Sequence, residues 1–166
     1  MRGKVRAMTS YIDEVIRKVH RIAMELRPSL LDDLGLEAAI EWQLAEFREK
    51  TKIRGELKGS LADAALPRDM ATALFRIFQE ALTNVARHAD ADSIEIGLRS
   101  NGERIFLSVR DNGKGIEEES LAHARSLGIL GMQERVAVLG GELSINGAKG
   151  KGTTVLVSLP LRGCAA

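Results

Sequence analysis

The sequence predicts an α/β fold, because it carries two kinds of hydrophobic pattern. Between residues 67 and 88, apolar side chains recur every three or four positions, as on the buried face of a helix. Over residues 93–99 and 105–109, apolar residues alternate with polar ones, which is typical of strands with one buried face. With 166 residues, the chain is long enough for one hydrophobic core and a small appendage.

The composition excludes several classes of protein. Apolar residues make up 45% of the chain and charged residues 28%, as in an ordinary soluble domain. The net charge of +1 gives no general electrostatic reason to expect nucleic acid or an acidic membrane surface as a partner. Cys164 is the only cysteine, which excludes a disulfide framework and fits a reducing, cytoplasmic compartment. No apolar run approaches the roughly 18 residues of a membrane span, although the chain can belong to a longer, membrane-anchored protein.

The first residues predict a long helix that ends at Pro28. A helix of about 25 residues cannot bury a hydrophobic seam alone. The partner is either this chain's own core or, as we prefer, helices from outside this sequence or from a second subunit. The seam residues step by three and four positions alternately and are Val5, Met8, Ile12, Val15, Val19, Ile22 and Leu26.

A junction at residues 30–36 is expected to lead into a second helix over 37–50. A short strand near 53–57 and a loop with glycines follow. Pro67 is expected in the first turn of a third helix over 67–88, because proline suits that position.

The third helix carries polar residues on a face away from its apolar stripe. Asn84, Arg87 and His88 follow Glu80 by four, seven and eight residues, which places all four on one side of an α-helix. Asn and His are poor helix formers, so their presence indicates a use. A carboxylate and an amide oxygen one turn apart can bind Mg²⁺, and Arg and His can meet phosphate oxygens. For this face taken alone, a solvated surface is an equally weighted alternative.

The strand over 105–109 ends at Asp111, after a hairpin turn expected at residues 101–102. A carboxylate there can accept hydrogen bonds, while Gly113 and Gly115 allow left-handed dihedrals and close approach of a flat ligand. The combination indicates a pocket floor with one fixed acceptor. Taken alone, Asp-Asn-Gly is more often an ordinary turn.

Residues 117–127 are polar and are expected to form a loop. Residues 128–132, Gly-Ile-Leu-Gly-Met, open a further helix, whose first N–H groups and dipole suit a phosphate. Two strands over 142–146 and 153–159 complete the chain, with Thr153 facing either the core or a pocket.

Together, these motifs resemble in content, order and spacing the N, G1 and G2 boxes of the ATP-binding domain of sensor histidine kinases. Residues 26–36, Leu-Arg-Pro-Ser-Leu-Leu-Asp-Asp-Leu-Gly-Leu, are similar to the link between the dimerisation and catalytic domains in the subfamily that works with NarL-type response regulators. The resemblance extends from about residue 12 to 161. The matching motifs are Glu80...Asn84...His88, Asp111-Asn112-Gly113-Lys114-Gly115, Gly128-Ile129-Leu130-Gly131-Met132 and Gly150-Lys151-Gly152-Thr153-Thr154.

The resemblance implies a two-layer α/β sandwich with a mixed sheet and helices on one face, known as the Bergerat or GHKL ATPase fold. It divides the chain into residues 1–30, the second helix of a dimerisation and phosphotransfer bundle, and 31–166, the ATP-binding catalytic domain. The implied cofactors are ATP and Mg²⁺. The implied partners are the dimerisation helices of a homodimer and a NarL-type response regulator, with no nucleic acid and no direct membrane contact.

The resemblance also implies a role for each matching residue. Asp111 would accept a hydrogen bond from the adenine amine, Gly113 and Gly115 would give the base room, and Thr153 would lie near the adenine. Asn84 would coordinate Mg²⁺. The further implied site residues are Glu80 as the catalytic or metal-shell residue, Arg87 and His88 at the phosphates, Gly128, Ile129, Leu130, Gly131 and Met132 at the helix start, and Ile116 beside the G1 glycines.

The implied reaction is transfer of the γ-phosphoryl group to a histidine nitrogen, in which positioning and Mg²⁺ supply most of the catalysis. In this subfamily the acceptor histidine lies on the preceding helix and is followed by an acidic residue. His20 lies on the later helix and is followed by Arg21, so we expect it on the bundle surface. The fragment should therefore bind ATP without phosphorylating itself.

Three alternatives stay open. GHKL-type protein serine kinases of the anti-sigma-factor class share this type of fold, as do the ATP-driven clamps of topoisomerases and chaperones. The link at residues 26–36 and the short lid at 117–127 favour the histidine kinase over both. The third alternative is a dimerisation module without catalysis, whose purely structural form predicts no affinity for nucleotides.

Overall fold

A computed structural model describes residues 29–61, 66–115 and 127–161 of the chain. Within these ranges the chain forms α-helices, one π-helical turn and the strands of one sheet. In chain order they are α2 (Ser29–Thr51), β1 (Arg54–Lys58), α3 (Arg68–Asn84), the π turn η1 (Val85–Ala89), β2 (Ser93–Ser100), β3 (Arg104–Asp111), α5 (Leu127–Val138), β4 (Glu142–Gly147) and β5 (Thr153–Pro160).

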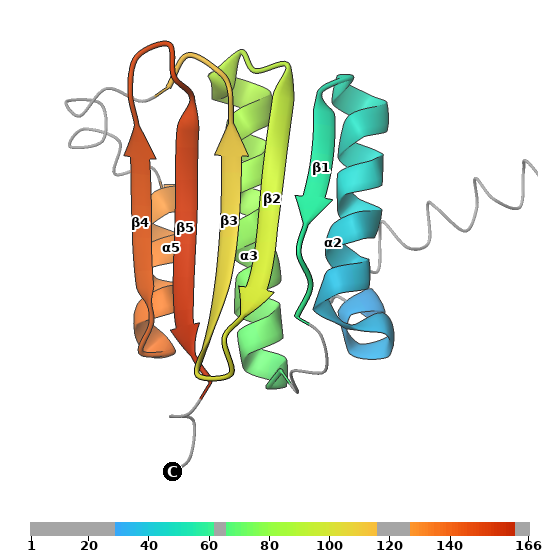
Figure 1. Cartoon of the computed structure of the whole chain (residues 1–166), viewed down its shortest axis with the longest axis vertical. Helices are drawn as coiled ribbons and strands as arrows, with labels where there is room; N and C mark the ends of the chain where they lie inside the picture. The colour runs from blue at the N-terminus through green and yellow to red at the C-terminus, as the bar shows by residue number, and fades with distance from the viewer. Residues whose placement is uncertain (1–28, 62–65, 116–126, 162–166) are drawn as a thin grey trace, which may run out of the picture.

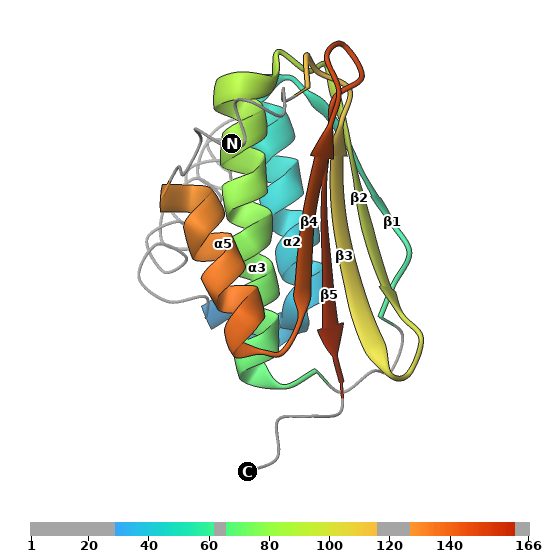
Figure 2. The same cartoon turned by 90° about the vertical axis from the view of Figure 1, so that its left-hand side faces the viewer.

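The strands form a mixed sheet with the helices on one of its faces (Figures 1 and 2). The strand order is β1-β2-β3-β5-β4, in which β1 runs parallel to β2 and every other neighbouring pair is antiparallel. The helix α3 packs against both α2 and α5. The expected two-layer α/β sandwich with a mixed sheet is therefore confirmed.

The hydrophobic core lies between the sheet and the helices. Ile96 of β2, Leu107 of β3 and Val157 of β5 are each no more than 1% exposed, as the period-two pattern of a strand with one buried face requires. From α3, the fully buried rings of Phe75 and Phe78 lie 6.2 Å apart between centroids. Burial of this apolar surface is the main force that joins the two layers.

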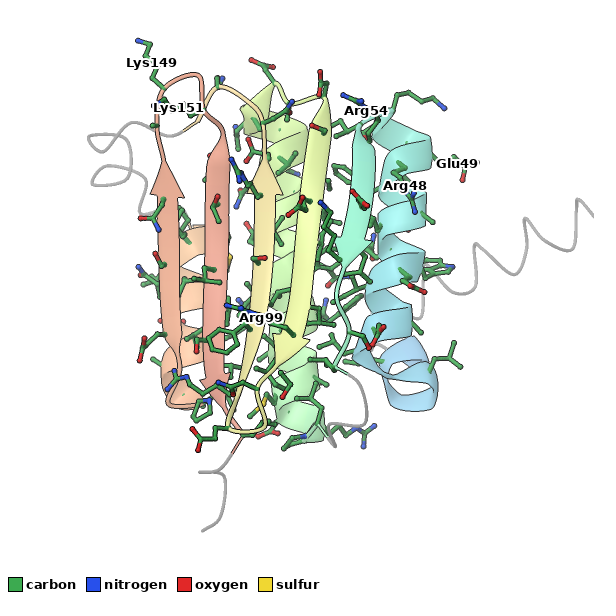
Figure 3. The ribbon with its side chains drawn as sticks, viewed as in Figure 1. Arg48, Glu49, Arg54, Arg99, Lys149 and Lys151 are labelled. Atoms are coloured by element: carbon green, nitrogen blue, oxygen red, sulfur yellow. The ribbon has the colours of Figure 1, made fainter. Side chains whose placement is uncertain are left out.

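The other face of the sheet is covered by no helix of the described residues, and it carries mainly polar side chains (Figures 2 and 3). Glu95 and Arg99 of β2 are exposed there, in alternation with buried residues of the same strand. The guanidinium of Arg99 lies 4.7 Å from the centre of the Phe106 ring on the neighbouring strand. This polar face explains the clean alternation of the strands in the sequence.

The helix α2 begins earlier than expected and contains a break. We predicted a junction at residues 30–36 and a helix from residue 37, whereas the helix begins at Ser29 and is interrupted at Gly35. Gly35 has φ of 82° and ψ of 174°, a conformation that glycine adopts without a steric penalty. The predicted junction thus contains a short helical segment and the break at Gly35, and the helix predicted over 37–50 follows this break. The break separates Leu34, which is 62% exposed, from Leu36, which is 4% exposed.

The helix predicted over 67–88 is confirmed, but its last turn, Val85–Ala89, is π-helical. A π turn is closed by i→i+5 hydrogen bonds and so holds more residues per turn than an α-helix. Arg87 and His88 are therefore rotated from the directions that α-helical spacing from Glu80 predicted.

The other boundaries differ only slightly from the prediction. The strand β1 covers Arg54–Lys58, which is one residue later at both ends than expected, and β5 continues one residue further than expected, to Pro160. Pro67 stands immediately before α3 and not within its first turn.

Several predictions fall on segments outside the described residues. They concern the helix over 5–26, His20, Ile116 and the lid over 117–126. The division of the chain at residue 30 also stays a prediction. Among the described helices, none is both long and apolar enough to cross a membrane.

Candidate functional site

The predicted site residues gather at one end of the sheet. The end of α3, the end of β3 and the loop between β4 and β5 all lie along the upper edge in Figure 1. Asp111, the last residue of β3, is 5% exposed, and alternation with buried Val109 points it toward the helix layer. Asn84 ends α3 at the same edge. Asn84 and Asp111 therefore lie on the same side of the sheet and at the same end.

Thr153 begins β5 beside Asp111. The ladder between β3 and β5 pairs Arg110 with Thr154. One further step of this antiparallel register places Thr153 opposite Asp111. Both side chains lie two residues from a buried valine of their own strand, so both face the helix layer. The two residues predicted to contact the adenine are thus neighbours.

The carboxylate of Asp111 holds the loop that follows it. Its Oδ1 accepts a hydrogen bond from the N–H of Gly113 at 2.8 Å, as in an Asx turn. No buried side-chain nitrogen or oxygen of the described residues lacks a hydrogen-bond partner. The second oxygen, which has no partner of its own among those residues, is therefore open to solvent and available to a ligand.

Gly113 lets this loop lie against the end of η1. A Cβ at Gly113 would overlap the carbonyl oxygen of Ala89. That same oxygen accepts a hydrogen bond from the N–H of Lys114 at 2.8 Å. The structure thus gives a reason for this glycine in the close approach of two backbones. Its predicted role in making room for the base stays a prediction.

Gly115 and Gly152 join the loop after β3 to the loop between β4 and β5. Gly115 has φ of 77°, and a Cβ there would overlap the carbonyl oxygen of Ala148. A Cβ at Gly152, which also has φ of 77°, would overlap the carbonyl oxygen of Asp111. The N–H of Gly150 donates to the carbonyl of Lys114 at 2.7 Å. The G1 and G2 motifs are therefore packed together through their backbones.

Asn112 is a further residue of this site that the sequence reasoning did not single out. Its Oδ1 accepts from the N–H groups of Asp92 and Ser93 at 3.1 and 3.0 Å, and its Nδ2 donates to Asp92 Oδ1 at 2.8 Å. Arg54 donates to the same Asp92 oxygen at 3.1 Å. The hydrogen bond from Asn112, followed by that from Arg54, lowers the pKa of Asp92. A turn signal describes local bonds, whereas these partners lie 20 and 19 residues away in the sequence.

Glu80 and Asn84 offer oxygens that no neighbour uses. Both side chains are half-buried, and neither has a hydrogen-bond or ion-pair partner among the described residues. The carboxylate of Glu80 lies against the start of α5, since a Cβ at Gly128 would overlap Glu80 Oε1. Since no buried side-chain oxygen of the described residues lacks a partner, the oxygens of Glu80 and Asn84 are accessible to solvent and to a ligand. The pair is therefore suited to hold a cation.

The start of α5 faces this pair. The helix begins at Leu127, so the residues of the predicted phosphate cradle, 128–131, lie in its first turns. The positive end of a helix dipole stabilises anions there. Leu130 is 44% exposed and Ile129 is half-buried against the core. Met132 is 0% exposed and belongs to the core, so its side chain serves packing, and its predicted contact with ATP stays a prediction.

Arg87 and His88 do not point the same way. Arg87 lines a hollow of about 410 Å³ between α2 and α3, together with Gln79 and Thr83 of its own helix. His88 is exposed at the end of η1 and does not line that hollow. Neighbouring residues of a helix point in directions about 100° apart, so the two side chains leave η1 on different sides. The phosphate contacts expected of both residues stay predictions.

The metal-binding capacity of this end of the sheet comes from few groups. The described ranges contain no group of three or more His, Cys, Asp or Glu side chains that could hold a metal ion. Mg²⁺ retains several waters and is usually bound by one or two protein oxygens together with substrate phosphates. Asn84 and Glu80 fit this mode of binding, and a dedicated protein cage is not needed.

Comparison with known families identifies the fold. Residues 69–163 match the family described as histidine kinase-, DNA gyrase B-, and HSP90-like ATPase. The chain belongs to this ATPase family. Membership makes ATP the expected nucleotide, because the matched segment contains the four motifs at residues 80–88, 111–115, 128–132 and 150–154.

Relatives of this ATPase-family chain include two histidine kinases. It is 37% identical over 151 residues to the sensor histidine kinase MctS of Rhizobium johnstonii, covering 90% of this chain and 32% of that protein. It is 32% identical over 158 residues to the signal transduction histidine-protein kinase/phosphatase DegS of Brevibacillus brevis, covering 95% of this chain and 41% of that protein. The chain thus spans less than half the length of these relatives.

Solved structures share the fold. The histidine kinase domain of the blue-light activated histidine kinase EL346 from Erythrobacter litoralis matches with a TM-score of 0.63 at 27% identity, over 76% of this chain and 61% of that one. The mycobacterial sensor histidine kinase MprB matches with a TM-score of 0.57 at 21% identity, over 75% of this chain and 95% of that one. At that lower identity the likeness concerns the fold alone.

Proposed function

We propose that this chain is the ATP-binding catalytic part of a sensor histidine kinase, which presents Mg-ATP for phosphoryl transfer to a histidine. One observation carries the proposal. The buried carboxylate of Asp111, with one oxygen open, lies at the same end and on the same side as the unpartnered oxygens of Glu80 and Asn84. Both histidine kinase relatives match over at least 90% of the chain, which favours this member of the family over the others.

The adenine would bind at the end of β3. The free oxygen of Asp111 accepts a hydrogen bond from the exocyclic amine, and its burial makes this contact selective, because an unpaired carboxylate there would be costly. Thr153 contacts the base from the neighbouring strand. Gly113 and Gly115 keep the loop beside the base free of side chains.

The phosphates would lie between α3 and α5. Asn84 supplies an amide oxygen to Mg²⁺, and Glu80 binds a water of the metal or the metal itself. When bound, Mg²⁺ neutralises charge on the β- and γ-phosphates. The start of α5 at residues 128–131 adds the positive end of a helix dipole. His88 reaches the phosphates from the end of η1, and Arg87 is a weaker candidate because it lines the hollow beside α2.

The reaction would be an in-line displacement. A neutral nitrogen of the acceptor histidine attacks the γ-phosphorus, the bond from that phosphorus to the β,γ-bridging oxygen breaks, and ADP leaves with the electron pair. The phosphoryl group is then bound to the histidine nitrogen. The proton that the imidazole ring loses passes to water or to a nearby base such as Glu80. This chain contributes by positioning and electrostatics, and we expect the acceptor histidine on a helix outside it.

The full-length protein would work as a homodimer through its dimerisation helices, one of which we expect at residues 1–30, and would pass the phosphoryl group to a NarL-type response regulator in the cytoplasm. The similarity of residues 26–36 to the link of that subfamily supports the choice of regulator.

Titration of the chain with a fluorescent ATP analogue, with and without Mg²⁺, tests the nucleotide part of the proposal. We expect saturable binding that Mg²⁺ strengthens and that unlabelled ATP displaces. The absence of any binding would leave only a structural dimerisation module.

Phosphate transfer distinguishes the kinase classes. The chain is mixed with a separate helical domain that carries an acceptor histidine followed by an acidic residue, and with ATP labelled at the γ-phosphate. Label that is lost in acid and stable in base supports a phosphohistidine. Acid-stable label on serine would instead support the anti-sigma-factor type of kinase.

A further inference from the structure

The carboxylate of Asp111 divides its oxygens between two tasks. Oδ1 accepts the N–H of Gly113 at 2.8 Å and is committed to the loop. The other oxygen is open, as the absence of unsatisfied buried side-chain atoms in the described ranges requires. An acceptor held in this way is aimed in one direction. Whatever fixes the position of the loop therefore fixes the direction of the remaining oxygen.

Asn112 ties that loop to a distant part of the chain. Its side chain makes two acceptor bonds and one donor bond to Asp92 and Ser93, over distances of 2.8 to 3.1 Å. Its own N–H donates to the carbonyl of Ser93 at 3.2 Å. Arg54 of β1, which Figure 3 places at this same end, donates to Asp92 as well. The loop is thus connected through Asn112 to the start of β2 and to the edge strand.

Asn112 does not itself face the proposed nucleotide. It is exposed, whereas Asp111 beside it is buried, so the two side chains point away from each other. Any influence of Asn112 on a ligand must pass through the backbone that the two residues share.

We propose that Asn112 is a positioning residue that aims Asp111 at the exocyclic amine of a purine, and so sets the preference for ATP over nucleotides with a 6-oxo purine. This inference rests on the proposed ATP-binding function. Without the Asn112 side chain, the loop is still held by the bond from Lys114 to Ala89 and the bond from Gly150 to Lys114. The chain therefore folds, but the free oxygen of Asp111 samples more directions.

Base selectivity is the property that reports this role. The amine of ATP donates to the carboxylate, whereas the carbonyl of inosine triphosphate (ITP) faces it without a proton between them. A well-aimed carboxylate discriminates sharply and a loosely aimed one does not. A purely structural role would lower stability and would weaken the binding of both nucleotides by the same factor.

The turn that connects β2 to β3 provides a matched control, because the two strands form a hairpin whose open end carries Asn112. Asn101 also accepts two backbone N–H groups, from Glu103 and Arg104 at 3.1 and 2.7 Å, but at the opposite end of the sheet. The affinities of the wild-type chain, Asn112→Ala and Asn101→Ala for Mg-ATP and Mg-ITP are measured by titration. We expect a wild-type preference for ATP of about tenfold or more. In Asn112→Ala this preference should fall about five- to tenfold, with ITP affinity nearly unchanged, and Asn101→Ala should keep it.

Each outcome decides a different question. If the wild-type chain binds both nucleotides equally or neither, the proposed adenine contact of Asp111 fails. If the wild-type chain prefers ATP and Asn112→Ala prefers it to the same degree, the positioning role of Asn112 is overturned while the proposed function stands.

A milder pair of variants covers the case in which Asn112→Ala does not fold. Asn112→Asp keeps the two acceptor bonds to backbone N–H groups but sets a carboxylate against Asp92. In the double variant Asn112→Asp with Asp92→Asn, the amide at position 92 can donate to the carboxylate at position 112, which is the reverse of the wild-type hydrogen bond. We expect the preference for ATP to drop in the single variant and to return in the double variant. A single variant with wild-type preference would overturn the inference.

Discussion

The two ends of the hairpin formed by β2 and β3 use the same chemistry for different purposes. At the closed end, Asn101 accepts N–H groups two and three residues ahead of it, so its bonds stay within the turn. At the open end, Asn112 accepts N–H groups 20 and 19 residues behind it, and glycines there press backbone against backbone. The closed end only reverses the chain, whereas the open end assembles several segments around a buried carboxylate. Contacts between segments that are distant in the sequence therefore distinguish the candidate site at the open end from the simple turn at the closed end.

The largest difference between the ends should appear when a glycine of each is replaced. Gly152 and Gly102 have φ of 77° and 85°, so alanine is strained at both, but only at Gly152 would its Cβ overlap another backbone atom, the Asp111 carbonyl. We expect Gly102→Ala to lower the free energy of unfolding by about 1 kcal/mol. Gly152→Ala should lower it by about 3 kcal/mol. Urea unfolding of both variants measures this, and equal losses would show that the loops separate freely.

A carboxylate-to-amide change at each end tests where nucleotide recognition lies. Asp111→Asn keeps an oxygen for the N–H of Gly113 but can present an NH2 group to the purine amine. We expect ATP affinity to fall roughly 30- to 100-fold, with little change in thermal stability. Glu103→Gln in the closed turn, an exposed position, should leave affinity unchanged. An Asp111→Asn variant that binds ATP as the wild type does would remove the assigned adenine contact.

Binding of Mg²⁺ at the open end can be tested separately from binding of the adenine. In Asn84→Ala we expect the strengthening of ATP binding by Mg²⁺ to shrink about tenfold, because one protein oxygen is lost from the metal site. Binding without Mg²⁺ should be nearly unchanged. The control is Asn146→Ala, since Asn146 lies on β4 and its exposed side chain donates to Ser144 of the same strand at 2.7 Å. Equal Mg²⁺ dependence in wild type and Asn84→Ala would exclude Asn84 as a ligand.

The smallest expected effect is on the pKa of Asp92 and so on stability at low pH. The hydrogen bond from Asn112, with that from Arg54, lowers the pKa of Asp92 below its ordinary 3.8. A lowered pKa in the folded state means that the contribution of Asp92 is complete above about pH 4 and is lost as the pH falls through the folded value. In Asn112→Ala the pKa of Asp92 should rise toward its ordinary value, as a carboxyl titration by NMR can follow. An unchanged titration would assign the shift to the hydrogen bonds from Arg54 and Ser93.

Local patterns were enough to predict most of the fold. The period of two in β2 and β3 and the period of three to four in α3 arise from burial of one face, so each element's type and approximate bounds are readable from its own residues. Asp111 was identifiable because it directly follows such a pattern. Asn84 was identifiable because Asn and His, which are poor helix formers, share one face of the helix with Glu80.

What sequence reasoning missed depends on contacts between distant segments. The side chain of Asn112 forms hydrogen bonds with Asp92 and Ser93, which lie 20 and 19 residues away in the sequence, and a local turn pattern does not predict such bonds. The π turn changed the direction of Arg87, because spacing arguments assume a regular α-helix. Met132 lies in a glycine-rich motif, yet its direction relative to the core is set by how α5 packs. The helical turn before Gly35 was missed because residues 30–34 are too few to show a period of their own, whereas the helix after Gly35 was predicted.

The loops at the open end are joined in series by peptide groups. The carbonyl of Ala89 bonds to the N–H of Lys114, and the carbonyl of Lys114 bonds to the N–H of Gly150. Bonds between peptide groups do not depend on side-chain identity, so the exposed positions 114 and 148 can vary in chemistry without disturbing this scaffold, whereas Ala89 is buried and must stay small. Mutational tolerance is therefore expected to be broad along these loops and to stop abruptly at the glycines, a contrast useful to anyone who redesigns the loops.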